Sequence, residues 1–136
     1  MSDIRRVTED FAVAPQIAPE DMGKAAKAGF VLVINNRPDG EAPDQPDSAV
    51  MAAAAKAAGL AYLHVPVVGR PTTEQVEAVA AAVQEAKGPV LAFCRSGTRS
   101  INTWSLGQAV SGARPTDELI RLGADAGYDL SGVLGV

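Results

Sequence analysis

The sequence predicts an α/β protein with a central, mostly parallel sheet flanked by helices. Short apolar runs that are typical of buried strands alternate along the chain with longer segments of helical periodicity. This alternation is the pattern of βαβ units around a parallel sheet. The 136 residues, 47% of them hydrophobic, suffice for one core, so we expect one domain over residues 1–136.

The chain begins with two short segments that favour strands, Ile4–Val7 and Phe11–Val13. The polar Thr-Glu-Asp sequence between them predicts a hairpin. A helix is expected next, from Pro19 to Ala28. Proline suits the first helical position, and Gly29 favours a helix end.

Two strands with a helix between them are expected to follow. The apolar run Phe30–Ile34 is rich in β-branched residues, which is typical of a strand buried on both faces. An alanine-rich helix is expected over Ser48–Ala58 and ends at Gly59. The next strand is Leu60–Val65, which ends at Pro66.

The second half of the chain predicts one more strand and three helices. Thr72 and Gln75 fit a capping box, in which the hydroxyl and the amide each bind the backbone of the other residue. The remaining elements are a helix from this cap to Lys87, the strand Val90–Phe93, a helix that opens within Thr98–Thr103 and runs to about Val110, and a final helix from the cap Thr116 to near Gly127.

Charge and cysteine content exclude several classes of function. The chain has 12 basic and 16 acidic residues and a net charge of −4, whereas nucleic acids and anionic membranes require a basic face. The single cysteine allows no intrachain disulfide and no thiol-rich metal site. No segment is typical of a signal peptide or a membrane span. We therefore expect a cytoplasmic protein without metal, cofactor, nucleic-acid or membrane partners.

The loop Cys94–Ser100 holds the residues with the clearest chemistry. It reads Cys-Arg-Ser-Gly-Thr-Arg-Ser and lies between a predicted strand and a predicted helix. A helix N-terminus offers unpaired N–H groups, and Gly97 lets these groups converge on one anion. Arg99 adds a planar fork for an oxyanion. In this field Cys94 is expected to ionise and act as a nucleophile, so Cys94 and Arg99 are the candidate catalytic residues.

Seven further residues are candidates for substrate binding. They are Arg95, Ser96, Gly97, Thr98, Ser100, Arg37 and Arg70. The loop hydroxyls either contact the Cys94 sulfur or cap the following helix. Arg37 and Arg70 follow other strands of the predicted sheet, and ligands bind beyond the carboxyl ends of parallel strands. The two arginines either form a positive mouth for the site or pair with Asp39 or Glu41.

Two residues near this site fit structural positions better than functional ones. His64 is the only histidine and lies inside a predicted strand, on the same face as Tyr62. Trp104 lies about one helical turn beyond the loop, where a large aromatic side chain is more typical of the core than of a substrate platform.

The loop resembles the active-site loops of two families of cysteine enzymes. The Cys-x4-Arg spacing from Cys94 to Arg99 is similar to that of rhodanese sulfurtransferases. Tyrosine and dual-specificity phosphatases carry His-Cys-x5-Arg, whereas here Phe93 precedes the cysteine and Ser100 stands at the phosphatase arginine position. The order of segments nevertheless resembles the phosphatases, and the Gly-His-Ile-Pro-Gly-Ala-like segment of rhodaneses is absent from the sequence.

This combination resembles the phosphatase-like domains related to the beta-lactamase hydrolase-like proteins, which pair a dual-specificity-phosphatase fold with a rhodanese-type loop. Supporting matches are Ile34–Glu41 and Tyr62–Val67, and the resemblance extends from Arg6 to Asp129. Such domains occur alone or fused to a persulfide dioxygenase. The resemblance implies sulfurtransferase or phosphatase activity and does not choose between them.

The residues favour sulfur transfer. A phosphatase of this type needs an acid to protonate the leaving oxygen, and no carboxylate lies between Leu60 and Thr73. We therefore expect sulfane sulfur to pass from thiosulfate or a low-molecular-weight persulfide to Cys94, and then to a thiol acceptor such as glutathione, or to cyanide. The alternatives are a cysteine-dependent phosphatase and a non-catalytic anion-binding module that docks on a sulfide-oxidising enzyme, such as a persulfide dioxygenase.

Overall fold

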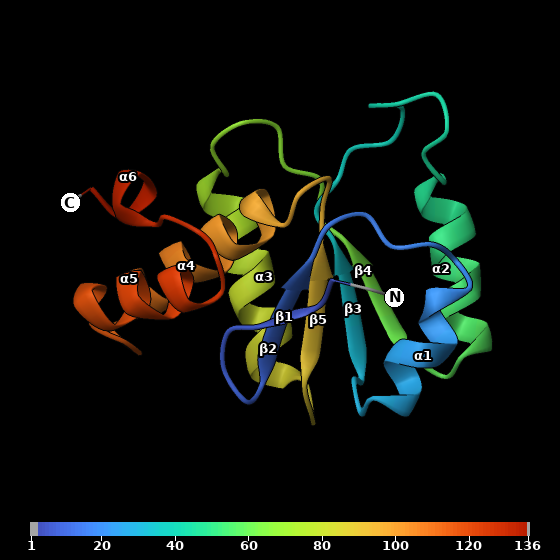
Figure 1. Ribbon diagram of the computed structural model, residues 1–136, viewed down its shortest axis with the longest axis horizontal. Coiled ribbons are helices and arrows are strands. Elements are labelled where there is room, and N and C mark those ends of the chain that lie inside the picture. The colour runs from blue at the N-terminus through green and yellow to red at the C-terminus, as the bar shows by residue number, and fades with distance from the viewer. Residues whose placement is uncertain (1–2, 136) are drawn as a thin grey trace.

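The computed structural model describes residues 3–135 and places a five-stranded sheet between layers of helices (Figure 1). The strands are β1 (Arg5–Arg6), β2 (Phe11–Ala14), β3 (Leu32–Asn35), β4 (Ala61–His64) and β5 (Val90–Phe93). The helices over these residues are α1 (Asp21–Lys27), α2 (Ser48–Ala57), α3 (Thr73–Glu85), α4 (Thr98–Ser111), α5 (Thr116–Asp125) and α6 (Ser131–Leu134).

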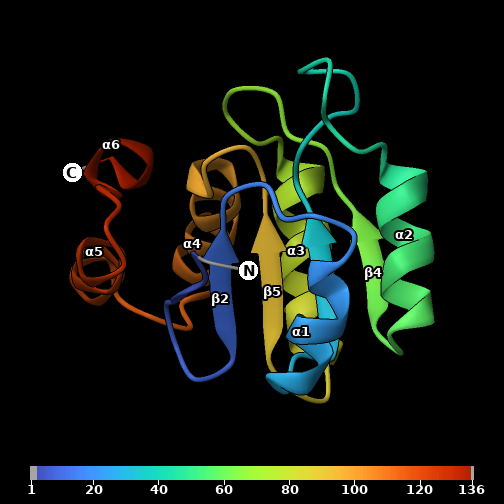
Figure 2. The same cartoon turned by 45° about the vertical axis from the view of Figure 1, so that its right-hand side comes forward.

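The sheet has the strand order β1-β2-β5-β3-β4, with β1 antiparallel to β2 and the other pairs parallel. This arrangement confirms the predicted α/β fold with a mostly parallel sheet, and β1 with β2 confirms the predicted hairpin. In Figure 2 the arrowheads of β2, β5, β3 and β4 point to the same edge, and the long connecting loops gather beyond it. Because β5 lies between β2 and β3, the loop that follows β5 is flanked by their loops.

Strands β2, β3 and β5 are buried on both faces, as their apolar runs predict, whereas the edge strand β4 is only partly buried. Phe11 and Val13 of β2 belong to a core that includes residues of α3, α4 and α5. Ala12 and Ala14 belong to a second core, shared with α1 and α2. In β5, Val90 and Ala92 alternate in the same way with Leu91 and Phe93. The period-2 geometry of strands explains why apolar residues are needed at every position.

Trp104 of α4 packs into the first of these cores. Its ring stacks on Phe11 of β2, with ring centroids 4.9 Å apart and an interplanar angle of 7°. Trp104 is only 4% exposed, so the predicted core position is confirmed. The stack joins α4, the helix that follows the Cys94 loop, to the sheet.

One predicted helix boundary and one predicted strand boundary differ from the structure in the N-terminal part of the chain. Helix α1 begins at Asp21 and not at Pro19, because the Asp21 carboxylate accepts a hydrogen bond from the Ala18 N–H (2.8 Å) and holds the preceding residues in a turn. The strand predicted over Phe30–Ile34 is observed over Leu32–Asn35. The Val31 N–H still donates to the Pro89 carbonyl (2.9 Å), and its carbonyl accepts from the Ala61 N–H (3.0 Å). The Thr72–Gln75 capping box is confirmed, with both reciprocal hydrogen bonds present.

The prediction that the helix from Thr116 is the last one was wrong. Pro115 caps α5 and Thr116 is its first residue, and the chain leaves the helix at Gly127, whose φ is +93°. Asp129 then accepts hydrogen bonds from the N–H (3.0 Å) and the hydroxyl (2.6 Å) of Ser131. These bonds start the short helix α6, and they lower the pKa of Asp129.

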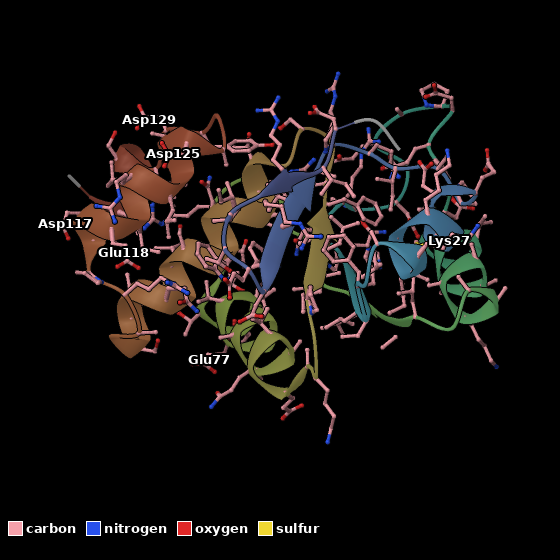
Figure 3. The ribbon with its side chains drawn as sticks, turned by 60° about the horizontal axis from the view of Figure 1, so that its bottom comes forward. Lys27, Glu77, Asp117, Glu118, Asp125 and Asp129 are labelled. Atoms are coloured by element: carbon pink, nitrogen blue, oxygen red, sulfur yellow. The ribbon has the colours of Figure 1, made fainter. Side chains whose placement is uncertain are left out.

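A group of acidic side chains lies on helix α5 and directly after it. Asp117, Glu118, Asp125 and Asp129 all lie on or next to α5, far from Lys27 on α1 (Figure 3). The first two of these carboxylates are in the first turn of α5, where they complement the helix dipole. Within residues 3–135, no helix combines the length and the apolar character that membrane crossing requires.

We expect the substitution Phe11→Ala to lower the free energy of unfolding by about 3–5 kcal/mol, because it removes a buried ring and its stacking contact with Trp104. The control Val31→Ala changes a partly exposed side chain and should cost less than about 1 kcal/mol. Urea unfolding measures both values. Equal costs for the two variants would contradict the assignment of Phe11 to the core.

Candidate active site

The Cys94 sulfur lies at the base of a tight loop between β5 and α4. Cys94 follows β5 directly and is fully buried, and Thr98 begins the helix. The Gly97 N–H donates a hydrogen bond to the sulfur over 3.1 Å. Gly97 adopts a left-handed conformation with a φ of +91°, which turns its N–H back toward Cys94. The predicted nucleophile is therefore in contact with the backbone cradle that the sequence suggested.

Tyr128 holds this loop from outside. Its hydroxyl donates to the Ser96 carbonyl over 2.9 Å, and a Cβ atom on Gly97 would collide with the same hydroxyl. The Arg5 guanidinium lies over the Tyr128 ring, 5.4 Å from its centroid. Burial raises the pKa of Tyr128, and the nearby Cys94 charge acts in the same direction, so the phenol remains a donor. Sequence reasoning missed Tyr128 as a site residue.

Arg99 lies beside the sulfur but is bound to a carboxylate. Its Nη1 and Nη2 atoms donate to Oε2 and Oε1 of Glu41, each over 2.8 Å, which is a bidentate pair. Nη1 also donates to the Val67 carbonyl over 2.8 Å. The pKa of Arg99 is raised, first by the hydrogen bond to Glu41 and further by the charge and hydrogen bonding of Cys94.

Glu41 is the main feature of the site that sequence reasoning missed. Its two carboxylate oxygens accept hydrogen bonds from Arg99, and one of them, Oε1, also accepts from Nε of Arg37 over 3.0 Å. The hydrogen bond from Arg99, with a further contribution from Arg37, lowers the pKa of Glu41 to about 2. The available signal was the four-residue spacing from Arg37, which suggested a pair but did not point to Arg99.

The two arginines predicted outside the loop have different positions. Arg37 is buried and donates to Gln16 (3.1 Å) as well as to Glu41, so the paired alternative is confirmed and Arg37 is not a free cation at the mouth. Arg70 is exposed, and its Nη2 reaches the Val133 carbonyl of α6 at 3.4 Å. The structure therefore does not bring Arg70 to the Cys94 loop.

The remaining loop candidates divide between exposed and buried positions. Arg95 has an exposed side chain at the rim of the loop. The Ser96 hydroxyl donates to the Thr98 hydroxyl over 3.0 Å and accepts from the Thr98 N–H over 3.4 Å, which fits the capping alternative. The Ser100 hydroxyl is fully buried, and it has no hydrogen-bond partner among residues 3–135. A direct contact of Ser100 with the sulfur stays a prediction.

Asn36 ties together the three loops at this edge of the sheet. Its N–H donates to the Phe93 carbonyl (2.8 Å), its side-chain amide donates to the Val65 carbonyl (3.0 Å), and its carbonyl accepts from Val67 (3.0 Å). His64 forms a 2.8 Å hydrogen bond with the Arg37 carbonyl, so it supports a loop and does not contact Cys94. The gathering of the loops after β3, β4 and β5 agrees with the prediction.

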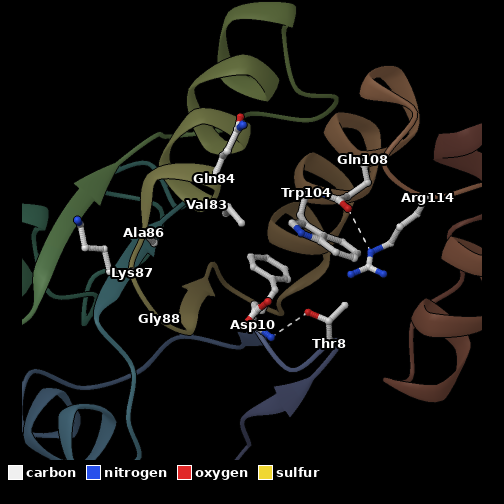
Figure 4. A pocket seen from close by; sticks show the side chains of 11 residues that line it. Thr8, Asp10, Val83, Gln84, Ala86, Lys87, Gly88, Trp104, Gln108 and Arg114 are labelled. Carbon is white, nitrogen blue, oxygen red and sulfur yellow. Dashed lines mark hydrogen bonds between the residues drawn. The ribbon is translucent and has the colours of Figure 1, made fainter.

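A hollow at the opposite end of the sheet contains none of the residues of the Cys94 loop. This cavity of about 460 Å³ lies where β2 and β5 begin, between α3 and α4 (Figure 4). Arg114 in its wall is paired with Gln108 and Glu118. In the described part of the chain, no group of three or more His, Cys, Asp or Glu side chains is arranged to hold a metal.

Comparison with known families matches residues 3–111 to the family described as "Beta-lactamase hydrolase-like protein, phosphatase-like domain". The chain belongs to this family. Among its relatives, the beta-lactamase hydrolase-like protein of Xylella fastidiosa (strain Temecula1 / ATCC 700964) is 38% identical over 125 residues. This match covers 91% of the chain but only 29% of the relative, so the phosphatase-like domain spans less than a third of that protein's length.

Solved structures agree with membership of the phosphatase-like family. A protein from Neisseria meningitidis Z2491, provisionally described as a phosphatase, is 34% identical with a TM-score of 0.84, over 97% of this chain and 94% of the other. A mouse protein provisionally described as a dual-specificity phosphatase shares the fold at 19% identity, with a TM-score of 0.72 over 99% and 84% of the two chains. The expected family and fold are confirmed. These findings favour the phosphatase alternative, and they do not support the sulfurtransferase expected from the loop spacing.

We expect the substitution Gly97→Ala to destabilise the protein by about 2 kcal/mol or more, because it combines a left-handed conformation with a collision against Tyr128. Gly59→Ala is the matched control. Gly59 has a φ of +82° with open space around it, so its substitution should cost about 1 kcal/mol. Urea unfolding of both variants, and of Gly97→Ala combined with Tyr128→Phe, measures the difference. Additive effects in the double variant would exclude the collision.

The lowered pKa of Glu41 predicts how the stability of the protein changes at low pH. A carboxyl group whose pKa falls on folding stabilises the protein above its ordinary pKa, 4.5 here, and loses this effect as the pH falls toward about 2. Wild type should therefore exceed Glu41→Gln in unfolding free energy by a constant amount above about pH 5, and the difference should shrink below it. Urea unfolding between pH 7 and pH 2.5 tests this. A difference that does not depend on pH would contradict the ion pairs.

Proposed function

We propose that this domain is a cysteine-dependent hydrolase of phosphate monoesters. The observation that carries the proposal is the buried Cys94 sulfur, which accepts a hydrogen bond from the Gly97 N–H in the same loop as Arg99, in a chain of the phosphatase-like family. Backbone N–H groups at the start of α4 and an arginine are suited to a tetrahedral oxyanion.

In the proposed reaction the Cys94 thiolate attacks the phosphorus of the ester. A sulfur–phosphorus bond forms as the phosphorus–oxygen ester bond breaks, and the leaving oxygen takes the bonding electron pair. Water then attacks the phosphocysteine, which releases inorganic phosphate and returns the thiolate. The loop N–H groups and Arg99 stabilise the negative charge on the transferred group in both steps.

The surroundings of Cys94 restrict the leaving group. The loop from Val65 to Thr72 contains no carboxylate. Glu41 is close, but two arginines hold it in its charged form with a pKa of about 2, so it does not donate a proton near neutral pH. We therefore expect aryl phosphates, whose leaving oxygen is stable as an anion, to react far faster than alkyl phosphates.

Sulfur transfer is a second candidate, and the same lack of an acid favours it. The Cys94 thiolate would attack the outer sulfur of thiosulfate, forming a sulfur–sulfur bond while sulfite leaves with the electron pair of the old one. Sulfite needs no proton to leave. An external thiol such as glutathione would then take the outer sulfur and return the thiolate, since the chain has no second cysteine. A low-molecular-weight persulfide, from a persulfide-handling partner enzyme, is the other donor.

The deciding experiment compares wild type with Cys94→Ser. We expect wild type to release phenolate from para-nitrophenyl phosphate, and the variant to lose about 10³-fold or more of this activity because the nucleophile is gone. Intact-protein mass spectrometry after thiosulfate, and separately after glutathione persulfide, runs in parallel. A gain of one sulfur mass that glutathione or cyanide reverses, without phosphate ester turnover, would replace the first candidate by the second. If neither activity is observed, the non-catalytic anion-binding module is the remaining candidate.

A further inference from the structure

The hydrogen bonds of Arg99 leave one edge of its guanidinium available. Arginine has five N–H donors in a planar fork. Glu41 takes one hydrogen of Nη1 and one of Nη2, and the Val67 carbonyl takes the second hydrogen of Nη1. The Nε hydrogen and the second Nη2 hydrogen remain, and these two lie on the same edge of the plane. This edge has the geometry that binds two oxygens of one anion.

Arg99 belongs to the same loop as the nucleophile, in the first turn of the helix that follows Cys94. The charge of Cys94 contributes to raising the pKa of Arg99, after the larger effect of the hydrogen bond to Glu41. No oxygen of residues 3–135 occupies the Nε–Nη2 edge. An oxyanion bonded to the Cys94 sulfur would therefore meet two unused donors.

Glu41 is itself held rigidly enough to orient Arg99. Arg37, which is buried and anchored on Gln16, donates to the Glu41 carboxylate from another direction. The Glu41 backbone N–H donates to the Gln45 side chain (3.0 Å), and the Gln45 amide donates to the Pro38 carbonyl (2.8 Å). The loop before α2 thus braces the carboxylate against the active-site arginine.

We infer that Glu41 is a positioning residue, which grips the Nη1–Nη2 end of Arg99 and presents the Nε–Nη2 edge to a tetrahedral oxyanion at Cys94. This inference rests on the proposed function, since it requires an oxyanion in the loop. The arrangement serves phosphate and thiosulfate alike, because both present tetrahedral oxygens.

A competing role predicts the opposite effect of removing Glu41. If its carboxylate merely occupied Arg99 and cancelled its charge, the substitution Glu41→Gln would free the arginine and strengthen anion binding. If Glu41 positions Arg99, the same substitution loosens the guanidinium and weakens anion binding, although the site becomes more positive. The sign of the change in affinity therefore distinguishes the two roles.

The test measures protection of Cys94 from iodoacetamide by inorganic phosphate at constant ionic strength. We expect Glu41→Gln to raise the phosphate concentration needed for half protection by about 10-fold, and Glu41→Asp to lie between it and wild type. The KM for para-nitrophenyl phosphate should rise with it, and kcat should change less. Asp44→Asn is the matched control. This carboxylate lies exposed in the same loop and has no contact with Arg99, so its removal should leave protection unchanged.

Each outcome bears on one of the two proposals. If phosphate does not protect wild-type Cys94, the oxyanion site fails, and the proposed function fails with it. If phosphate protects wild type and protects Glu41→Gln equally or better, the positioning role is overturned while the site survives. Should Glu41→Gln not fold, as judged by its unfolding transition, Glu41→Asp decides: weaker protection supports the role, and equal or tighter protection overturns it.

Discussion

The pairing of β5 at the centre of the sheet constrains the rest of this molecule. With β2 on one edge, β3 on the other and an apolar core on each face, every backbone group and side chain of β5 is committed to packing. A reactive side chain can therefore be placed only where the strand ends, at Cys94. Both neighbouring strands are parallel to β5, so their following loops come to the same edge, and Asn36 fastens two of them to the end of β5.

The site is locally basic within an acidic chain, and its charges are balanced in pairs. The chain has 16 acidic against 12 basic residues, and four of the carboxylates lie on or next to α5. Next to Cys94, the charges of Arg37 and Arg99 meet one carboxylate, Glu41, and the sulfur itself. This arrangement keeps two buried or half-buried guanidinium groups paired, which offsets the cost of removing them from water. It also leaves part of Arg99 for an incoming anion.

The family of this chain and the residues around Cys94 do not favour the same reaction equally. The fold and its relatives point to phosphatases, while the five-position step from Cys94 to Arg99 and the lack of a proton donor are features on which phosphate and sulfane sulfur chemistry differ. One fold supports several reactions when the residues around the nucleophile change. The leaving group is the property that separates the candidates, since an alkoxide needs a proton and sulfite does not.

Local sequence patterns determined the strands, most helix limits and the identity of the nucleophile loop. Apolar runs, the capping box at Thr72 and the glycine of the Cys94 loop act over a few residues, so neighbouring residues suffice to predict them. Tertiary structure alone decided the partners of that loop. Glu41 lies 58 positions before Arg99, and Tyr128 lies 32 positions after Ser96. Such pairs form because the sheet order and the packing of α5 and α6 on α4 bring distant segments together. Patterns among neighbouring residues do not predict these contacts.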